Sequence, residues 1–333
     1  MKKITVSAPG KLMLLGEHAV VYNRPCIVTA VDQRMQATIE LLDEPVFVLE
    51  APDVKITGYK KPMSEIGNGD IPKGAKFVEI AVKSFWGAVR LQNLDSGQKA
   101  RMTGMRVTTK SEFSSQFGFG SSSASTVCII KGLSKIFGLK LTNKQIFDIA
   151  FKTVLDVQGK GSGFDVAAAM YGGTLYFVTG GKVIKPLAIK TLPLVVGYSG
   201  VKADTVTLIN QVSVLAKKYP RVIENIYDQI ENLVELAKKA MLKNDWQTVG
   251  ELFNINQGLL SSLGVSGQKL EDMIYTARNA GAYGAKLSGA GGGDCMIALS
   301  SKENKKVVSE SITKAGGHVL DVLVNAPGVR VEK

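Results

Sequence analysis

The chain has 333 residues, 45% of them apolar, which is enough to fill the cores of two domains. Its net charge of +12 favours either an anionic ligand or a solvated basic surface. The basic residues are dispersed, with no basic block and no interleaved aromatic platform, which argues against nucleic-acid binding.

The amino-terminal stretch predicts no targeting segment. Its short apolar piece is broken by Pro9 and Gly10, so neither a signal peptide nor a membrane span is expected. The three cysteines, Cys26, Cys128 and Cys295, lie far apart in apolar surroundings, with no close pair to bind zinc. We expect reduced core thiols and a cytoplasmic protein without membrane association.

The first half of the chain predicts alternating strands and helices. Residues 43–75 are rich in proline, glycine and aspartate and predict a loop or a weak hairpin. Thr142 is a candidate N-cap. From apolar periodicity we expect strands at 4–7, 35–42, 105–110 and 172–178, and helices at 76–91, 122–137 and 142–155.

Composition changes near residue 190, where a second domain is expected to begin. The order of its elements suits an antiparallel sheet with helices on one face, an α+β layer. We expect strands at 192–198, 294–299 and 318–324, and helices at 205–218, 222–242, 246–263, 270–280 and 302–315.

A Gly/Ser turn at 114–125 stands directly before a run with helical spacing. Gly118 and Gly120 let a ligand approach the main chain, and the free N–H groups of the helix would face that ligand. This pattern predicts an anion site, although a serine-capped helix after a flexible loop is the alternative. A Walker loop is absent, and Ser123 replaces the third glycine of a dinucleotide fingerprint.

Three further segments place charged residues beside glycines. Residues 8–22 hold Lys11, Glu17 and His18 between apolar residues, where burial requires a partner or a ligand. Residues 158–169 deliver Asp165 to the start of an Ala-rich helix, where it can accept a hydroxyl proton or cap the helix. Residues 286–295 form a glycine-rich loop that either closes over phosphates or makes a tight crossing in the sheet.

In this order, the four segments resemble the GHMP kinase superfamily of galactokinases, homoserine kinases, mevalonate kinases and phosphomevalonate kinases. The resemblance spans nearly the whole chain. It implies an α+β GHMP kinase fold with a ribosomal protein S5 domain 2-like N-terminal domain at 1–190 and a ferredoxin-like C-terminal domain at 191–333. It also implies ATP bound between the two domains.

Within the superfamily, residues 16–21 and 250–260 resemble mevalonate kinases, which phosphorylate the 5-hydroxyl of mevalonate in isoprenoid biosynthesis. Residues 161–169 and 291–295 look more like phosphomevalonate kinases, so phosphomevalonate remains an alternative acceptor. A non-catalytic sensor built on this fold is a second alternative. A homodimer is compatible with the sequence.

The resemblance also implies roles for single residues. Asp165 would act as the base, with Lys11 beside it. Glu17, His18 and Ser162 would contact the substrate. Val154 replaces the glutamate that usually binds Mg²⁺, so Ser122, and Asp156 after a register shift, are the candidate metal ligands. The residues expected to cradle ATP are Gln116, Phe117, Gly118, Phe119, Gly120, Ser121, Ser122 and Ser123.

Overall fold

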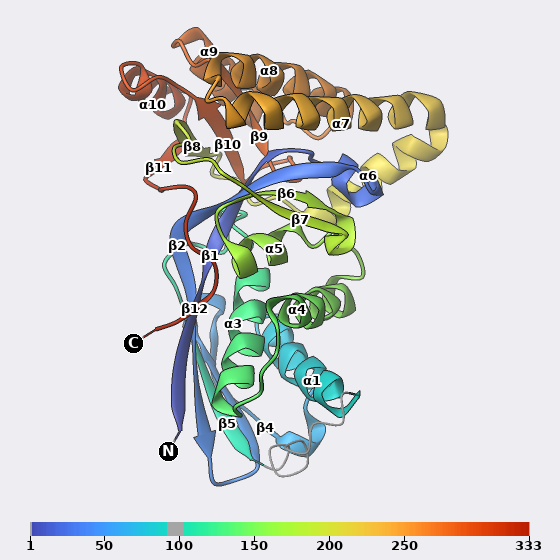
Figure 1. Cartoon of the computed structure of the whole chain (residues 1–333), viewed down its shortest axis with the longest axis vertical. Helices are drawn as coiled ribbons and strands as arrows, with labels where there is room; N and C mark the ends of the chain where they lie inside the picture. Colours follow the sequence, from blue (N-terminus) through green and yellow to red (C-terminus); the bar gives the residue numbers. More distant parts are fainter. Residues whose placement is uncertain (1, 92–102, 333) are drawn as a thin grey trace.

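The computed structural model describes residues 2–91 and 103–332 and contains two β-sheets, one above the other (Figure 1). Among these residues the larger sheet has eight strands, in the order β12-β1-β2-β5-β3-β4, with β6 beside β2 and β7 beside β6. Its strands are β1 (Lys3–Leu15), β2 (Pro25–Leu42), β3 (Val46–Ala51), β4 (Ile56–Pro62), β5 (Gly104–Ser111), β6 (Thr174–Val178), β7 (Val183–Leu187) and β12 (Arg330–Val331).

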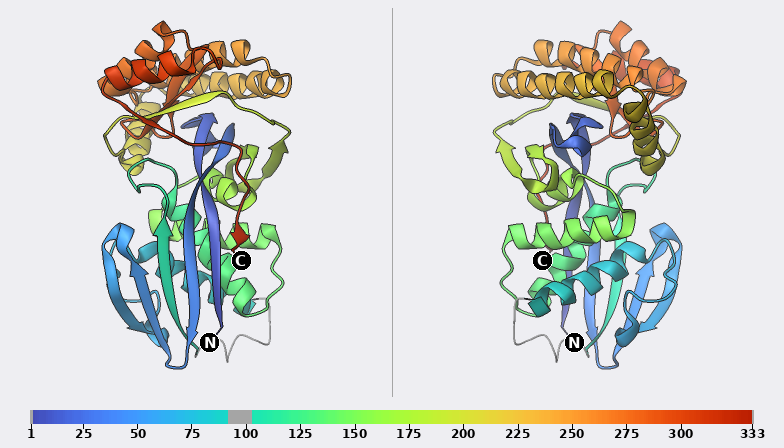
Figure 2. Two further views of the ribbon diagram at one scale, coloured as in Figure 1. Left: turned by 90° about the vertical axis from the view of Figure 1, so that its left-hand side faces the viewer. Right: turned by 90° about the vertical axis from the view of Figure 1, so that its right-hand side faces the viewer.

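Helices cover one face of this larger sheet, as both views of Figure 2 show. The helix α3 packs on β1 and β2, and α1 and α4 pack against α3. Thr142 caps α4 through a complete capping box with Gln145, which confirms the expected start of that helix. The helices are α1 (Lys76–Leu91), α3 (Ser121–Ile136), α4 (Asn143–Gln158) and α5 (Phe164–Tyr171), with 3₁₀ turns at η1 (Ala19–Tyr22), η2 (Pro52–Val54), η3 (Met63–Glu65) and η4 (Thr179–Gly181).

The first two strands are much longer than the sequence predicted. The first strand was expected at 4–7, yet β1 continues through Pro9 and Gly10 to Leu15. Pro9 pairs with Arg34 and Gly10 with Val31, so the bulge between them lies in β2, at residues 32–33, and β1 continues past it. As a result, Lys11 lies within a β-strand in the middle of the molecule. The segment 43–75 contains a hairpin, β3 and β4, one of the two outcomes expected for it.

The smaller sheet is fully antiparallel, in the order β11-β8-β10-β9. This confirms the expected antiparallel layer, although the strand β9 was not foreseen because glycines surround it. In chain order, the strands of this sheet and the helices between them are β8 (Leu194–Tyr198), α6 (Thr205–Lys218), α7 (Pro220–Leu242), α8 (Trp246–Ser262), α9 (Gln268–Asn279), β9 (Gly284–Ser288), β10 (Cys295–Leu299), α10 (Lys305–Lys314) and β11 (His318–Leu320).

Alternate side chains of the smaller sheet enter two different cores. Val195, Met296 and Ala298 pack with α9 and α10 in one cluster. Val196 and Ile297 belong to the larger cluster, which continues into the buried side chains of β1 and β2. Because side chains alternate along a strand, the same strands join both halves of the molecule. The two halves therefore share a continuous apolar interior.

The carboxyl-terminal segment returns to the first sheet, as the position of the C-terminus in Figure 1 shows. Val331 of β12 pairs with Val6 of β1. Arg34 donates hydrogen bonds to the carbonyls of Pro327 and Gly328 at 2.9 and 2.8 Å. The last residues of the expected 191–333 domain thus belong to the sheet of the 1–190 domain. Among the described residues, no helix has the length and apolarity required to cross a membrane.

Candidate functional site

A cavity of about 220 Å³ lies where the Gly/Ser turn meets the smaller sheet. Its wall combines elements that are far apart in the sequence: β1, the start of α3, the loop before α5, the start of α6 and the loop after β9. All four charged, glycine-rich segments found in the sequence contribute to it. The polar and charged lining residues are Lys11, Glu17, His18, Ser115, Ser121, Ser122, Gln158, Lys160, Ser162, Asp165, Lys202, Thr205 and Asp294.

The Gly/Ser turn presents backbone groups to this cavity. Gly118 and Gly120 both have positive φ, at 71° and 78°, a region that glycine adopts without strain. Gly120 is the N-cap of α3 and supplies no side-chain acceptor, so the first N–H groups of the helix remain available. Gly118, Gly120, Ser121 and Ser122 line the cavity.

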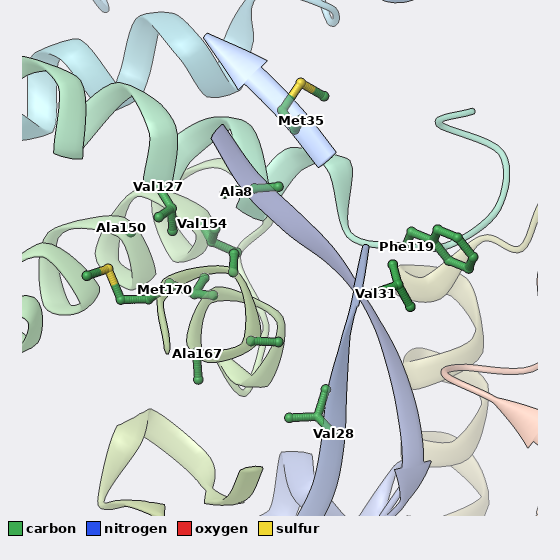
Figure 3. Close-up of a cluster of buried hydrophobic side chains, with 14 of the residues drawn as sticks. Ala8, Val28, Val31, Met35, Phe119, Val127, Ala150, Val154, Ala167 and Met170 are labelled. Carbon is green, nitrogen blue, oxygen red and sulfur yellow. The ribbon is translucent and has the colours of Figure 1, made fainter. Parts of the chain in front are cut away.

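The other four predicted turn residues do not line the cavity. Phe119 is buried beside Val31 in the core (Figure 3), so it anchors the turn. Phe117 packs edge-on against Phe119, and Gln116 is exposed. Ser123 points toward the next helix, as described below. Apolar side chains within the turn therefore hold it in place, and only its glycines and the first two serines face the cavity.

Lys11 and Asp165 meet at the Gly/Ser turn. The Lys11 ammonium donates to the carbonyl of Gly118 at 2.7 Å, and its backbone N–H donates to the carbonyl of Phe119 at 3.0 Å. A Cβ on Gly120 would lie 3.4 Å from Lys11 Cε and 3.6 Å from Asp165 Cβ. The turn, the ammonium and the carboxylate therefore converge on one point.

Asp165 occupies the first turn of α5, where Ser123 holds it. The Ser123 hydroxyl donates to Asp165 Oδ2 at 2.5 Å, and the N–H of Val166 donates to Oδ1 at 3.0 Å. Burial lowers the pKa of Lys11, and the nearby carboxylates of Asp165 and Asp294 oppose that shift. The buried Lys11 and the half-buried Asp165 are thus held next to each other at the cavity wall.

Glu17 has a different environment from the one expected for a substrate contact. It forms an ion pair with Lys286 of β9, and both side chains have 0% exposure. Its second carboxylate oxygen accepts from Asn256 of α8 at 3.1 Å. Both partners come from the smaller-sheet half of the molecule, so Glu17 connects the two halves. Burial lowers the pKa of Lys286, and Glu17 opposes that shift.

His18, the next residue, faces the cavity from a strained turn. Its φ is 59°, unusual for a residue with a side chain. The ring nitrogen Nε2 lies 2.9 Å from the carbonyl of Ala290, in the glycine-rich loop after β9. Burial lowers the pKa of His18. The contacts of Glu17 and His18 thus tie the amino-terminal motif to the loop that closes the cavity.

Of the remaining candidates, Ser162 lines the cavity and Asp156 does not. The Ser162 side chain is 4% exposed, and its hydroxyl has no hydrogen-bond partner among the described residues. Asp156 lies on the outer face of α4 and pairs with Lys152 at 2.7 Å. Val154 lines the wall at the position where an acidic ligand was missing from the sequence. The structure therefore does not bring Asp156 to the site.

Three charged residues at the cavity had no role in the sequence prediction. Asp294 lies on the glycine-rich loop, 3.6 Å from the Lys202 ammonium, and Lys160 lies on the loop before α5. A Cβ on Gly118 would lie 2.3 Å from Asp294 Oδ2, so only glycine fits there. A lysine or aspartate within a glycine run was the available signal, but sequence alone does not show which loops share a cavity.

Comparison with known proteins agrees with this geometry. Residues 82–173 match the GHMP kinases N terminal domain, and residues 237–318 match the GHMP kinases C terminal domain. A mevalonate kinase from Thermococcus gammatolerans is 35% identical, with 99% of each chain covered.

Among solved structures, the mevalonate kinase of Methanococcus jannaschii has a TM-score of 0.80 at 25% identity, over 97% of this chain and 98% of that one. A phosphomevalonate kinase from Streptococcus pneumoniae has a TM-score of 0.78 at 18% identity, over 97% of this chain and 100% of that one. That second likeness shows the fold alone. The chain belongs to the GHMP kinase family, and its full-length relatives are mevalonate kinases.

Proposed function

We propose that this protein transfers the γ-phosphoryl group of ATP to the 5-hydroxyl of mevalonate, giving 5-phosphomevalonate and ADP. The observation that supports this most directly is the convergence of Lys11 and Asp165 on the Gly/Ser turn within one cavity. Phosphoryl transfer needs a held phosphate, a cation against the developing charge and an oriented hydroxyl, and these three parts match those needs. The choice of mevalonate as the acceptor follows from the mevalonate kinases that resemble the chain along its full length.

The triphosphate would bind along Gly118–Ser122. The free N–H groups at the start of α3 and the positive end of its dipole attract phosphate oxygens. Lys11 would lie against the transferring group, where its charge stabilises the transition state. Asp165, oriented by Ser123, would accept the proton of the acceptor hydroxyl. His18 and Ser162 would contact the acceptor. Glu17 would act indirectly: its buried ion pair with Lys286 would hold the adjacent residue His18 in position.

Magnesium would be held by Ser122 together with ATP phosphate oxygens and water. Mg²⁺ commonly binds through few protein ligands and substrate phosphates, which fits a site with a serine hydroxyl at the turn. Among the described residues, no group of three or more His, Cys, Asp and Glu side chains is arranged to hold a metal ion. The bound ion would neutralise charge on the phosphates.

Substitution of Ser122 by alanine should raise the magnesium concentration needed for half-maximal activity, because one oxygen ligand is lost. Titration of activity with Mg²⁺, and calorimetry of ATP binding at several Mg²⁺ concentrations, would measure this. Ser121→Ala is the matched control, since it removes a neighbouring hydroxyl that also faces the cavity. An unchanged titration for Ser122→Ala would remove Ser122 from the metal site.

The acceptor is tested by ADP release with mevalonate, phosphomevalonate, homoserine and galactose in parallel. We expect turnover with mevalonate and background rates with the other three. Turnover with phosphomevalonate but not mevalonate would contradict the proposed acceptor while leaving the kinase assignment intact. ATP binding without turnover of any of the four would count against the proposed function itself.

A further inference from the structure

Lys160 is a cavity cation for which the family resemblance implied no role. It lies in the loop Gly159–Gly163, between α4 and α5, and lines the cavity together with Ser162 and Asp165. Its ammonium donates to the amide oxygen of Asn210 on α6 at 2.8 Å. That contact joins the loop to the smaller-sheet half at the edge of the cavity.

Lys160 differs from the other two lysines in the cavity wall in the charged groups near its ammonium. Lys11 is buried near Asp165, and Lys202 lies 3.6 Å from a carboxylate oxygen of Asp294. Among the described residues, no carboxylate forms an ion pair with Lys160, whose hydrogen-bond partner is a neutral amide. An unmatched cation that faces a cavity can attract an anionic ligand.

A second polar group beside Lys160 also lacks a partner. The Ser162 hydroxyl, two residues along the same loop, is buried and unpaired among the described residues, and it faces the same cavity. An unpaired buried hydroxyl is destabilising, so a ligand atom that accepts a hydrogen bond from it is favoured. One short loop thus offers both a positive charge and a hydrogen-bond donor.

The two other lysines lie on the triphosphate side of the cavity. Lys11 bonds to the Gly/Ser turn, and the Asp294 partner of Lys202 lies against Gly118 of that turn. Lys160 instead lies on the loop that carries Asp165, where the acceptor hydroxyl would react. Five apolar residues also line this cavity and suit a short branched carbon chain: Val20, Val21, Phe164, Val206 and Ile209.

We propose that Lys160 and Ser162 form a subsite for the carboxylate of the acceptor. This proposal rests on the proposed function. Lys160 is then a specificity-determining residue that selects a hydroxy acid over a neutral alcohol of the same shape. On binding, the ammonium exchanges its contact with the Asn210 amide for a charge-assisted contact with the carboxylate. The apolar wall holds the carbon chain, and Asp165 meets the hydroxyl at the other end.

The test compares mevalonate with 3-methylpentane-1,3,5-triol, which replaces the carboxylate by a hydroxymethyl group. For Lys160→Met we expect KM for mevalonate to rise about 10- to 100-fold, the effect of losing a hydrogen bond to a charged group. KM for ATP should stay within about twofold, and kcat/KM for the triol should change little. Lys160→Arg should recover part of the loss because it keeps the charge.

Lys182→Met is the matched control, since Lys182 also donates to an asparagine amide oxygen, that of Asn23 at 3.1 Å, but does not line the cavity. Its kinetics should match those of the wild type. An unchanged preference of Lys160→Met for mevalonate over the triol would overturn the proposal, as would a rise in KM for ATP alone. Failure of the wild type to phosphorylate mevalonate would overturn both the subsite and the proposed function. If the wild type phosphorylates mevalonate and Lys160→Met has the same KM for mevalonate as the wild type, the subsite alone is overturned.

Discussion

Asp165→Asn should lower turnover by at least about a hundredfold while ATP binds with nearly unchanged affinity. The amide keeps the shape of the side chain but cannot take the hydroxyl proton. Asp165 lies beside Lys11 and the Gly/Ser turn, so it faces the point where the γ-phosphoryl group and the acceptor would meet. Steady-state kcat with mevalonate and calorimetric ATP affinity give the two readouts.

Ser123→Ala provides the control for this prediction. It removes the hydroxyl that holds Asp165 but leaves the carboxylate in place, so its effect on turnover should be clearly smaller than that of Asp165→Asn. Near-normal turnover of Asp165→Asn would rule out the base role. A parallel loss of ATP affinity would instead assign Asp165 to nucleotide binding.

Lys286→Met should lower the free energy of unfolding by about 3–5 kcal/mol, because it leaves a buried carboxylate without its counter-ion. The side chains of Glu17 and Lys286 both have 0% exposure, and in the variant Asn256 alone would remain to stabilise the Glu17 charge. Urea unfolding measures the change. KM for mevalonate should also rise, since His18 follows Glu17 directly and depends on its position.

The double variant Glu17→Leu with Lys286→Met separates the two effects. Apolar residues of similar size in place of a buried ion pair are often neutral or stabilising, so stability should return toward that of the wild type. KM for mevalonate should stay raised, because packing alone does not restore the anchor of the strained His18 turn. Wild-type stability in Lys286→Met would contradict the importance of the pair.

Local patterns predicted a large part of the fold. The helices α3 and α4 were expected near their observed bounds, because apolar periodicity and the Thr142 capping box are properties of adjacent residues. The strands β1 and β2 were predicted too short, because their full length depends on pairing with each other: Pro9 and Gly10 keep their partners in β2, and a bulge in β2 at residues 32–33 takes up the change of register. The strand β9 was missed for a similar reason, since β10 pairs with it across a glycine-rich loop.

The site divides in the same way. The turn at Gly118–Ser122 was predicted from the sequence, because glycines directly before a helix start are a local pattern. The burial of Phe119 and the outward position of Asp156 depend on how helices and strands pack against each other. This packing could not be predicted from the local sequence. A helix surface faces the cavity or the solvent according to its neighbours.

By itself, the sequence determined which segments can form a phosphate-binding turn, where the carboxylate and the ammonium proposed for catalysis, Asp165 and Lys11, lie in the chain, and which family the order of these segments resembles. The tertiary structure decided that Glu17 is buried with Lys286, that the buried Ser162 hydroxyl has no hydrogen-bond partner among the described residues, and that Lys160 lines the cavity and forms no ion pair with any of them. The physical reason is that burial and pairing of charges arise between residues far apart in the chain, 269 positions for Glu17 and Lys286. Such contacts exist only once the two sheets have packed together.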